Sequence, residues 1–320
     1  MRERSHGDVA RRYALPATWL VIVVVFGAIE PDTFLTTANL QNILGSQAVL
    51  VVITLGLLFP LTGGDYDLSV ASVLTLASMI VALLNVSHGW PVGWAILVAV
   101  AAGVAAGLIN GGLITLLRID PFVTTLGTGT FISGLVLWMS DSQTIGGVSQ
   151  TLVDPVISRH LLGVPLVFYY GLVLCAATWF VLDFTPTGRR LLFVGRSRSV
   201  ARLSGVRVER MRWGAFVASG TISAIAGVLY AGSTGGADPS SGATFLLPAF
   251  AAAFLGATSI SPGRFNAWGS FIAVYFLVTG ITGLELLGAE SFVQQLFYGG
   301  ALILAVALSR LGGGRLEPDE

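Results

Sequence analysis

Long apolar segments, separated by short polar breaks, make up most of this chain. Hydrophobic residues account for 54% of its 320 residues and charged residues for 11%, whereas a soluble domain averages about a quarter charged residues. A membrane-spanning helix needs roughly 20 apolar residues, and the hydropathy divides into about ten such segments. We therefore predict an all-α integral membrane protein with about ten transmembrane helices. The approximate spans are Leu15–Ile29, Gln47–Leu61, Leu68–Val86, Val92–Leu117, Phe122–Met139, Pro165–Leu182, Trp213–Ala231, Leu247–Ser259, Trp268–Gly283 and Phe292–Leu308.

Arginine supplies every basic side chain, because the sequence contains no lysine. Cytoplasmic loops of membrane proteins carry an excess of basic residues. With the N-terminus in the cytoplasm, this set of spans places every arginine inside except Arg159. Omitting one span would invert every later loop and destroy the bias, so we predict that both termini are cytoplasmic.

The absence of lysine also restricts the chemistry of the chain. A Walker A phosphate loop needs a lysine on the transferred phosphates, so this chain cannot hold ATP in that way. We therefore expect no cofactor on this chain and assign nucleotide hydrolysis to another subunit. The one cysteine, Cys175, lies in an apolar segment and is assigned to core packing. A membrane enzyme is disfavoured, because no cluster of histidine, cysteine or carboxylate groups shares one depth.

Small residues recur within the predicted helices at spacings that let two backbones approach closely. Gly103, Gly107 and Gly111 form two consecutive GxxxG steps, and Gly220 and Gly227 continue the pattern in the seventh span. Such residues favour tight contact between helices. We predict a small-residue-packed helix bundle within one subunit, in preference to a dimer contact through these glycines.

Polar side chains interrupt the apolar pattern in the segment GGDYDLSVAS, Gly63–Ser72, between the second and third spans. Its two glycines favour a helix break, Asp67 or Ser69 is suited to cap the next helix, and Asp65 adds a second carboxylate. Polar residues at membrane depth mark functional sites by default. The segment fits a broken helix that lines a substrate pathway or an ordinary cytoplasmic turn, and spacing alone favours neither.

Two further stretches supply candidates for a substrate pathway. Asn110 lies deep in the fourth span, where its amide needs a partner on a ligand or, more often, on another helix. Pro121 is suited to the first position of the fifth span, which we expect to expose Phe122, Thr124 and Thr125. An aromatic face with hydroxyls suits a neutral polyol, and it suits helix packing equally well.

Eight arginines lie between Arg189 and Arg212, in a predicted cytoplasmic loop over residues 185–212. Ser197 or Ser199 is suited to cap a short helix in this loop, and Gly205 is suited to end it. Apolar residues would share one face of that helix. We predict a docking element, in preference to a simple anchor for anionic lipid. Its residues are Ser197, Ser199, Val200, Ala201, Arg202, Leu203, Ser204 and Gly205.

Five motifs occur in an order typical of one family. They are GGDYDLSVAS at Gly63, GLINGGLI at Gly107, PFVTTLGTGTFISGL at Pro121, ARLSGVRV at Ala201 and FLGATSISPGRFNAWG at Phe254. Over nearly its whole length the chain resembles the membrane permease subunit of bacterial ABC importers of the ribose and simple-sugar type. The resemblance implies a single permease domain over residues 1–320, in the bacterial inner membrane, that works with a second permease copy.

The resemblance also implies partners. A cytoplasmic ATPase would hold ATP and Mg²⁺ and dock on the segment from Ser197 to Gly205, which would be the coupling helix. An extracytoplasmic solute-binding protein would deliver a sugar, with Asp141–Val164 and Gly232–Leu246 as the longest loops for its docking. Membrane lipid surrounds the chain, and no nucleic acid is expected. The residues before the coupling helix depart from the family's Gly-Gly-Asn pattern, because Gly195, Arg196 and Ser197 stand there.

Other transport functions stay open at this point. A branched-chain amino-acid permease or a nucleoside permease would have the same partners but a different substrate. A secondary carrier is a more remote alternative, since proton-coupled carriers usually need carboxylates or histidines at depth. From Val92 to Leu182 no ionisable residue lies in the middle of a predicted span. The most consistent interpretation is an ABC importer permease for a sugar or sugar-like polyol.

Overall fold

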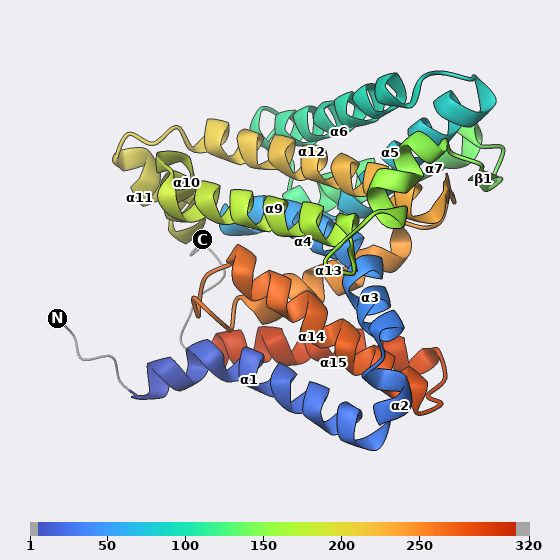
Figure 1. Cartoon of the computed structure of the whole chain (residues 1–320). Coiled ribbons are helices and arrows are strands. Elements are labelled where there is room, and N and C mark those ends of the chain that lie inside the picture. Colours follow the sequence, from blue (N-terminus) through green and yellow to red (C-terminus); the bar gives the residue numbers. More distant parts are fainter. Residues whose placement is uncertain (1–5, 312–320) are drawn as a thin grey trace.

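The computed structural model describes residues 6–311, and helices form almost all of this part of the chain (Figure 1). The α-helices are α1 (His6–Ile29), α2 (Pro31–Phe34), α3 (Thr37–Ser46), α4 (Ala48–Thr62), α5 (Val70–Ala82), α6 (Val92–Thr115), α7 (Pro121–Met139), α8 (Gln150–Val153), α9 (Leu166–Trp179), α10 (Pro186–Arg196), α11 (Arg198–Leu203), α12 (Val208–Thr234), α13 (Ala243–Gly256), α14 (Ala267–Leu286) and α15 (Phe292–Leu311). Wider π-helical turns are η1 (Leu83–Ser87), η2 (Asp154–Ser158) and η3 (Phe180–Phe184). Short strands β1 (Ile145–Gly146) and β4 (Gly236–Ala237) pair antiparallel, as do β2 (His160–Leu161) and β3 (Val164–Pro165).

Eight helical segments of the described chain are long and apolar enough to cross a membrane. They are Arg12–Ile29, Thr37–Thr62, Val70–Ser87, Val92–Thr115, Pro121–Met139, Leu166–Phe184, Val208–Thr234 and Ala267–Leu286. Two shorter apolar helices, Ala243–Gly256 and Phe292–Ala307, correspond to the eighth and tenth predicted spans. The all-α membrane architecture is therefore confirmed. The second span begins earlier than predicted, because α3 and α4 are separated only by Gln47.

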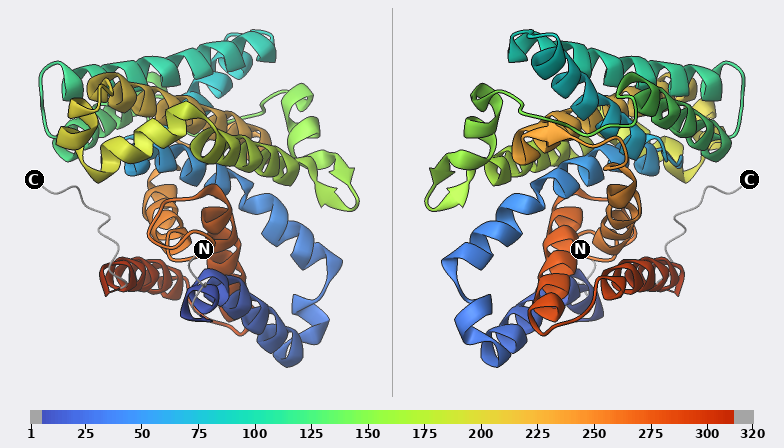
Figure 2. Two further views of the ribbon diagram at one scale, coloured as in Figure 1. Left: turned by 90° about the vertical axis from the view of Figure 1, so that its left-hand side faces the viewer. Right: turned by 90° about the vertical axis from the view of Figure 1, so that its right-hand side faces the viewer.

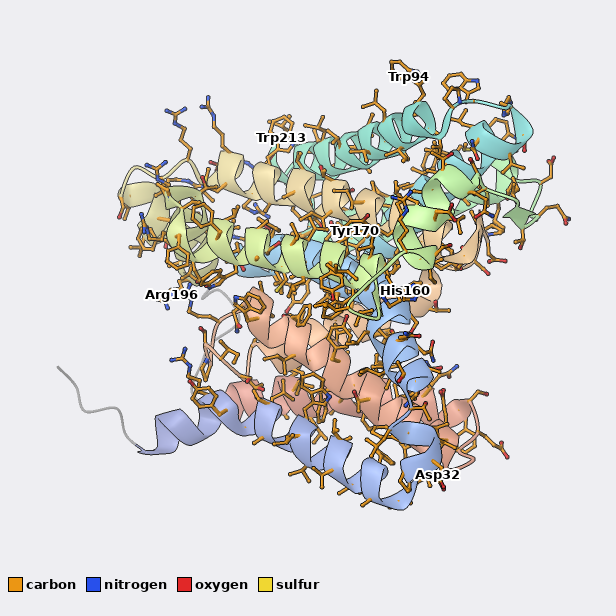
Figure 3. The ribbon with its side chains drawn as sticks, in the orientation of Figure 1. Asp32, Trp94, His160, Tyr170, Arg196 and Trp213 are labelled. Carbon is orange, nitrogen blue, oxygen red and sulfur yellow. The ribbon has the colours of Figure 1, made fainter. Side chains whose placement is uncertain are left out.

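The two described ends of the chain lie at the same end of the bundle. The start of α1 and the end of α15 are at the left of Figure 1, as are α10 and α11, whereas β1 and α2 lie at the right. Figure 3 places Arg196 at the first of these ends and Asp32 at the other. Since α10 and α11 carry most of the arginine cluster, the left end is the cytoplasmic side. This arrangement agrees with the prediction that both termini are cytoplasmic.

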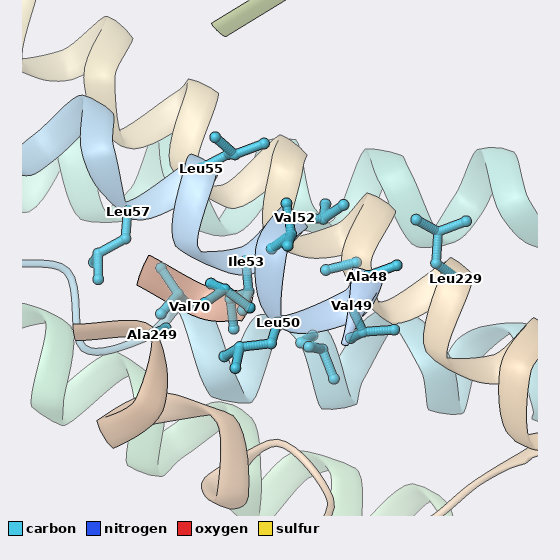
Figure 4. Packing of buried hydrophobic residues seen from close by; sticks show 14 of the residues in the cluster. Ala48, Val49, Leu50, Val52, Ile53, Leu55, Leu57, Val70, Leu229 and Ala249 are labelled. Atoms are coloured by element: carbon cyan, nitrogen blue, oxygen red, sulfur yellow. The ribbon is translucent and has the colours of Figure 1, made fainter. Parts of the chain in front are cut away.

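Helix α4 forms the centre of the bundle. All of its residues except Phe59 are buried, as expected for a helix that is hydrophobic on every face. It lies between α6 and α12 on one side and α1, α14 and α15 on the other (Figure 2). Its side chains belong to one apolar cluster with Leu229 of α12 and Ala249 of α13 (Figure 4). The helix that leads into the predicted break is thus held from all sides.

Small residues let α12 lie in close contact with α6 and α5. A Cβ on Gly107 of α6 would overlap the Phe216 carbonyl oxygen of α12, and a Cβ on Gly220 would overlap the Gly103 carbonyl oxygen. Gly227 of α12 approaches the backbone of α5 in the same way. The predicted packing of these glycines within one subunit is confirmed, and α12 becomes the helix against which α4, α5 and α6 are arranged.

Replacing Gly107 by alanine should lower the stability of the protein, because the added methyl group has no space between α6 and α12. The expected loss is about 1–3 kcal/mol, the usual range for overpacking. Gly134 of α7 has open space at the Cβ position, so Gly134→Ala is a matched control that should leave stability unchanged or slightly raised. The measurement is the midpoint of thermal unfolding in detergent, and equal midpoints for the two variants would contradict this packing.

Candidate functional site at the helix break

The predicted break between α4 and α5 is present. The helix ends at Thr62, the chain turns through Gly63 and Gly64, and helical structure resumes at Val70. Gly64 has φ +76°, a left-handed conformation that glycine adopts without strain. The carboxylates of the break are only 1–2% exposed. The break is therefore a turn between two helices that buries both of its carboxylates.

Asp67 organises the break with both of its carboxylate oxygens. Its Oδ1 accepts hydrogen bonds from the Ser69 backbone N–H at 3.0 Å and the Ser69 hydroxyl at 2.6 Å. Its Oδ2 accepts from the Ser219 hydroxyl of α12 at 2.7 Å. The prediction left Asp67 and Ser69 as alternative caps: Ser69 occupies the N-cap position of α5 without a capping bond from its side chain, and Asp67 accepts the hydrogen bond from the Ser69 N–H. Ser219 was not predicted, because a lone serine beside a packing glycine gives no signal in the sequence.

Asn110 extends this hydrogen-bond network to α6 and α7. Its Nδ2 donates to the Ser69 hydroxyl at 2.8 Å, and its Oδ1 accepts from the Thr128 hydroxyl at 2.7 Å. Asn110 is 1% exposed, so its amide is used for bonds between helices, the more frequent of the two expected roles. Thr128 was not predicted, although it lies one turn beyond Thr124 on α7. We call Asp67, Ser69, Asn110, Thr128 and Ser219 the break network.

The start of α7 packs on the break through its threonines. Pro121 is the first residue of the helix, as predicted, and Asp120 caps it. Thr125 is fully buried; its hydroxyl donates to the Pro121 carbonyl at 2.8 Å and accepts from the Leu68 N–H at 3.1 Å. The expectation that α7 exposes Thr124 and Thr125 is wrong for this conformation, because this side of α7 faces α5.

Aromatic side chains supply the accessible part of the site. Phe122 is 50% exposed, as predicted. Tyr66 lies on the break itself, is 36% exposed, and stacks on Phe250 of α13 with ring centroids 6.4 Å apart. This pair was not predicted, because Tyr66 and Phe250 are far apart in the sequence. Thr124 is buried, and its hydroxyl has no hydrogen-bond partner among the described residues.

Asp65 faces the arginine loop instead of the break network. Its Oδ1 accepts from Arg198 Nη2 at 2.7 Å and from Arg212 Nη2 at 2.8 Å, and its Oδ2 accepts from Arg212 Nε at 2.7 Å. Arg198 also donates to the Gly64 carbonyl at 3.0 Å. The sequence pattern grouped Asp65 with Asp67. In the structure Asp65 pairs with arginines, whereas Asp67 bonds serines.

The arginine loop contains the predicted short helix, α11. Ser197 caps it by accepting a hydrogen bond from the Val200 N–H at 3.4 Å, and Ser199 bonds the Ser197 hydroxyl at 3.1 Å. After Ser204, Gly205 ends the segment with φ +80°. Most of the loop before α11 is also helical: α10 covers Pro186–Arg196, and only Ser197 separates it from α11.

One face of α11 is anchored and the other is open. Ala201 is fully buried in a small apolar cluster with Val194 of α10 and Val208 of α12. Val200 is 49% exposed and Leu203 is 89% exposed. Arg202 pairs with Glu209 at the surface. An exposed apolar pair on a firmly seated cytoplasmic helix is suited to contact another protein.

The two longest outer loops are joined at the opposite end of the molecule. Strand β1 lies in the first loop and β4 in the second, with Ile145 paired to Ala237. Thr144 donates to Asp238 Oδ2 at 2.7 Å. Hydrogen bonds from Ser240 and Thr144 lower the pKa of the Asp238 carboxyl, so it is charged at neutral pH. We call this β1–β4 pair with its Thr144–Asp238 bond the outer clasp.

The chemistry of the site is that of binding and positioning. Among residues 6–311, no group of three or more histidine, cysteine, aspartate or glutamate side chains is placed to hold a metal ion. Cys175 is fully buried in the apolar cluster, as its assignment to core packing requires. The break brings polar groups together from α5, α6, α7 and α12, and its aromatic residues remain accessible.

Residues 39–306 match the protein family described as the permease component of the branched-chain amino acid transport system. The chain belongs to this permease family. It is a multi-pass protein of the bacterial inner membrane, and its predicted resemblance to ABC importer permeases is confirmed. A permease component is a transport subunit without a catalytic centre of its own.

Three relatives match the permease over most of their length. It is 35% identical to the ribose import permease protein RbsC of Bacillus subtilis, over 97% of this chain and 96% of that protein. It is 32% identical to the D-allose transport system permease protein AlsC of Escherichia coli, over 91% and 89%. It is 30% identical to the autoinducer 2 import system permease protein LsrD of Salmonella typhimurium, over 92% and 91%. No solved structure shows a significant match.

Replacing Asn110 by leucine should destabilise the permease by about 1 kcal/mol, a usual value for a hydrogen bond between membrane helices. The loss is moderate because the Thr128 hydroxyl also lies 3.0 Å from the Thr124 carbonyl and can donate to it instead. Thr130→Val is the control, since the exposed Thr130 hydroxyl bonds only the Leu126 carbonyl of its own helix. Thermal unfolding in detergent measures both variants, and a neutral Asn110→Leu would show that the bonds of Asn110 contribute nothing to stability.

Proposed function

We propose that this permease imports a sugar or a sugar-like polyol, driven by ATP hydrolysis on a separate cytoplasmic subunit. The observation that carries the proposal is α11, which presents Val200 and Leu203 to the cytoplasm while Ala201 fixes it to the bundle. A separate ATPase subunit needs an exposed contact surface of this kind on the permease. ATP and Mg²⁺ would be bound by that ATPase, because a lysine-free chain has no Walker A lysine.

The outer clasp supports docking of a solute-binding protein on the other side of the membrane. It joins the two loops predicted for this role, Asp141–Val164 and Gly232–Leu246, into one surface. A released solute would enter a pathway between two copies of the permease. ATP binding would shift the equilibrium between outward-facing and inward-facing conformations.

We assign the pathway wall to the helices that meet at the break. Phe122 and Tyr66 are accessible and supply aromatic faces, which suit the apolar faces of a sugar ring. Asp67, Ser69, Asn110, Thr124 and Thr125 are buried in this conformation. These buried residues would position the helices that form the pathway wall. They would contact a solute only if the break opened.

The sugar assignment rests on the relatives and on the charge of the site. The names of two of the relatives specify ribose and D-allose, whereas the family description specifies branched-chain amino acids. A zwitterionic amino acid needs countercharges in its pathway. In the described chain, Asp65 is neutralised by two arginines and Asp67 is fully engaged by serines. Both oxygens of each carboxylate already accept hydrogen bonds within the protein, which favours a neutral solute over one with an ammonium group.

Replacing both Val200 and Leu203 by aspartate should abolish association with the ATPase subunit, because two charges would enter the contact. Loss of a central apolar contact corresponds to a drop in affinity of about thirtyfold or more. Membrane insertion should be unchanged. The measurement is co-purification of the ATPase with tagged permease from membranes that contain the whole importer. Leu162→Asp is the matched control, since Leu162 is 91% exposed in an outer loop; full ATPase recovery with the double variant would contradict the proposal.

The complete importer in sealed vesicles should accumulate radiolabelled D-ribose or D-allose when ATP and the binding protein are supplied. The same vesicles should not accumulate L-leucine. Vesicles that contain the permease alone should transport none of the three solutes, because the chain supplies no energy source. ATP-driven uptake of leucine would support the amino-acid alternative, and sugar uptake by the permease alone would support a secondary carrier.

A further inference from the structure

Asp65 joins three elements of the chain through buried ion pairs. It lies on the break directly after α4, Arg198 is the first residue of α11, and Arg212 lies in the second turn of α12. The Asp65 side chain is 1% exposed, and those of Arg198 and Arg212 are 33% and 12% exposed. A buried carboxylate with two guanidinium partners is a strong positional constraint, because separating either pair leaves an uncompensated charge.

The end of α4 and helix α10 are in close contact at this junction. A Cβ on Gly195 of α10 would overlap the Thr62 carbonyl oxygen at the end of α4. Leu191 of α10 touches the position where Gly63 would carry a Cβ. Arg198 also holds the Gly64 carbonyl at 3.0 Å. A displacement of α10 and α11 must therefore move the first residues of the break or break these contacts.

The break leads from this junction to the break network. Asp65 precedes Asp67 by two residues, with Tyr66 between them. Asp67 bonds Ser219 of α12 and Ser69 at the start of α5, and Ser69 continues to Asn110 of α6. The ion pairs of Asp65 and the hydrogen bonds of Asp67 are thus joined by two residues of backbone, which connects the first residue of α11 with the interior of the bundle.

We propose that Asp65 is the residue through which movement of α11 is transmitted to the helix break. This inference rests on the proposed function, in which an ATPase moves α11. Asp65 is a positioning residue in this role and does not contact the solute. Neutralising it should leave α11 exposed and able to dock, while disconnecting the break from the nucleotide state of the ATPase.

The experiment follows the accessibility of Tyr66 in the complete importer. Cys175→Ala removes the only cysteine of the permease, and Tyr66→Cys places a thiol on the break beside Asp65. This parent permease is reconstituted with its ATPase subunits, and labelling by a maleimide is timed without nucleotide and with ATP, Mg²⁺ and vanadate. The labelling rate of the parent should change about fivefold or more between the two states, the lower end of usual coupling between sites.

Asp65→Asn in this parent should make the labelling rate the same in both states, with the ATPase still bound. Glu209→Gln is the matched control, because Glu209 also pairs with an arginine of α11 but lies at the surface; it should keep the parent response. Arg198→Gln provides a second test that keeps Asp65 paired with Arg212, and it should reduce the response to less than half.

Each alternative outcome has one meaning. A full nucleotide response in Asp65→Asn or in Arg198→Gln, or no response in the parent, would overturn the inference. If Asp65→Asn does not fold, Arg198→Gln decides between the same outcomes. If the ATPase fails to bind even the parent permease, the proposed function itself is refuted, and this inference with it.

Discussion

The hydrogen bonds of the helix break are the constraint on which the rest of the site depends. A buried turn between two helices must satisfy the peptide groups that the helix ends leave free. Here Asp67 accepts from the Ser69 N–H, Thr125 accepts from the Leu68 N–H, and the Pro60 carbonyl accepts from the Asp65 N–H. These partners come from the break, α7 and α4. The break is therefore held partly by its own residues and partly by α7, which packs on it.

Close packing fixes those helices. The glycines of α6 and α12 bring their backbones into contact, and this contact places Ser219 and Asn110 on opposite sides of the break network. Small residues contribute little hydrophobic burial themselves, but they allow the approach that polar side chains need to bond across helices. Packing and polarity are thus two parts of one arrangement, in which α12 supplies contacts to both.

Local signals predicted the parts of the structure that depend on neighbouring residues. Apolar length predicted the eight long apolar segments and the two shorter apolar helices of the described chain, and the arginine distribution predicted the cytoplasmic end. Ser197 and Gly205 predicted the limits of α11. The partners of Asp65 lie 133 and 147 residues away, and no local pattern points across that distance. Thr128 and Ser219 were not predicted either, because a hydroxyl in a helix usually bonds the backbone of its own helix.

Helix α12 is tied at both of its ends. Its 27 residues cover about 40 Å, from Arg212 and its bond to Asp65 at the cytoplasmic end to β4 and the outer clasp. A movement of the outer loops and a movement of the arginine loop therefore act on the same helix. The two faces of the membrane are thereby connected by a single continuous helix, through which a conformational change that begins at one face can reach the other.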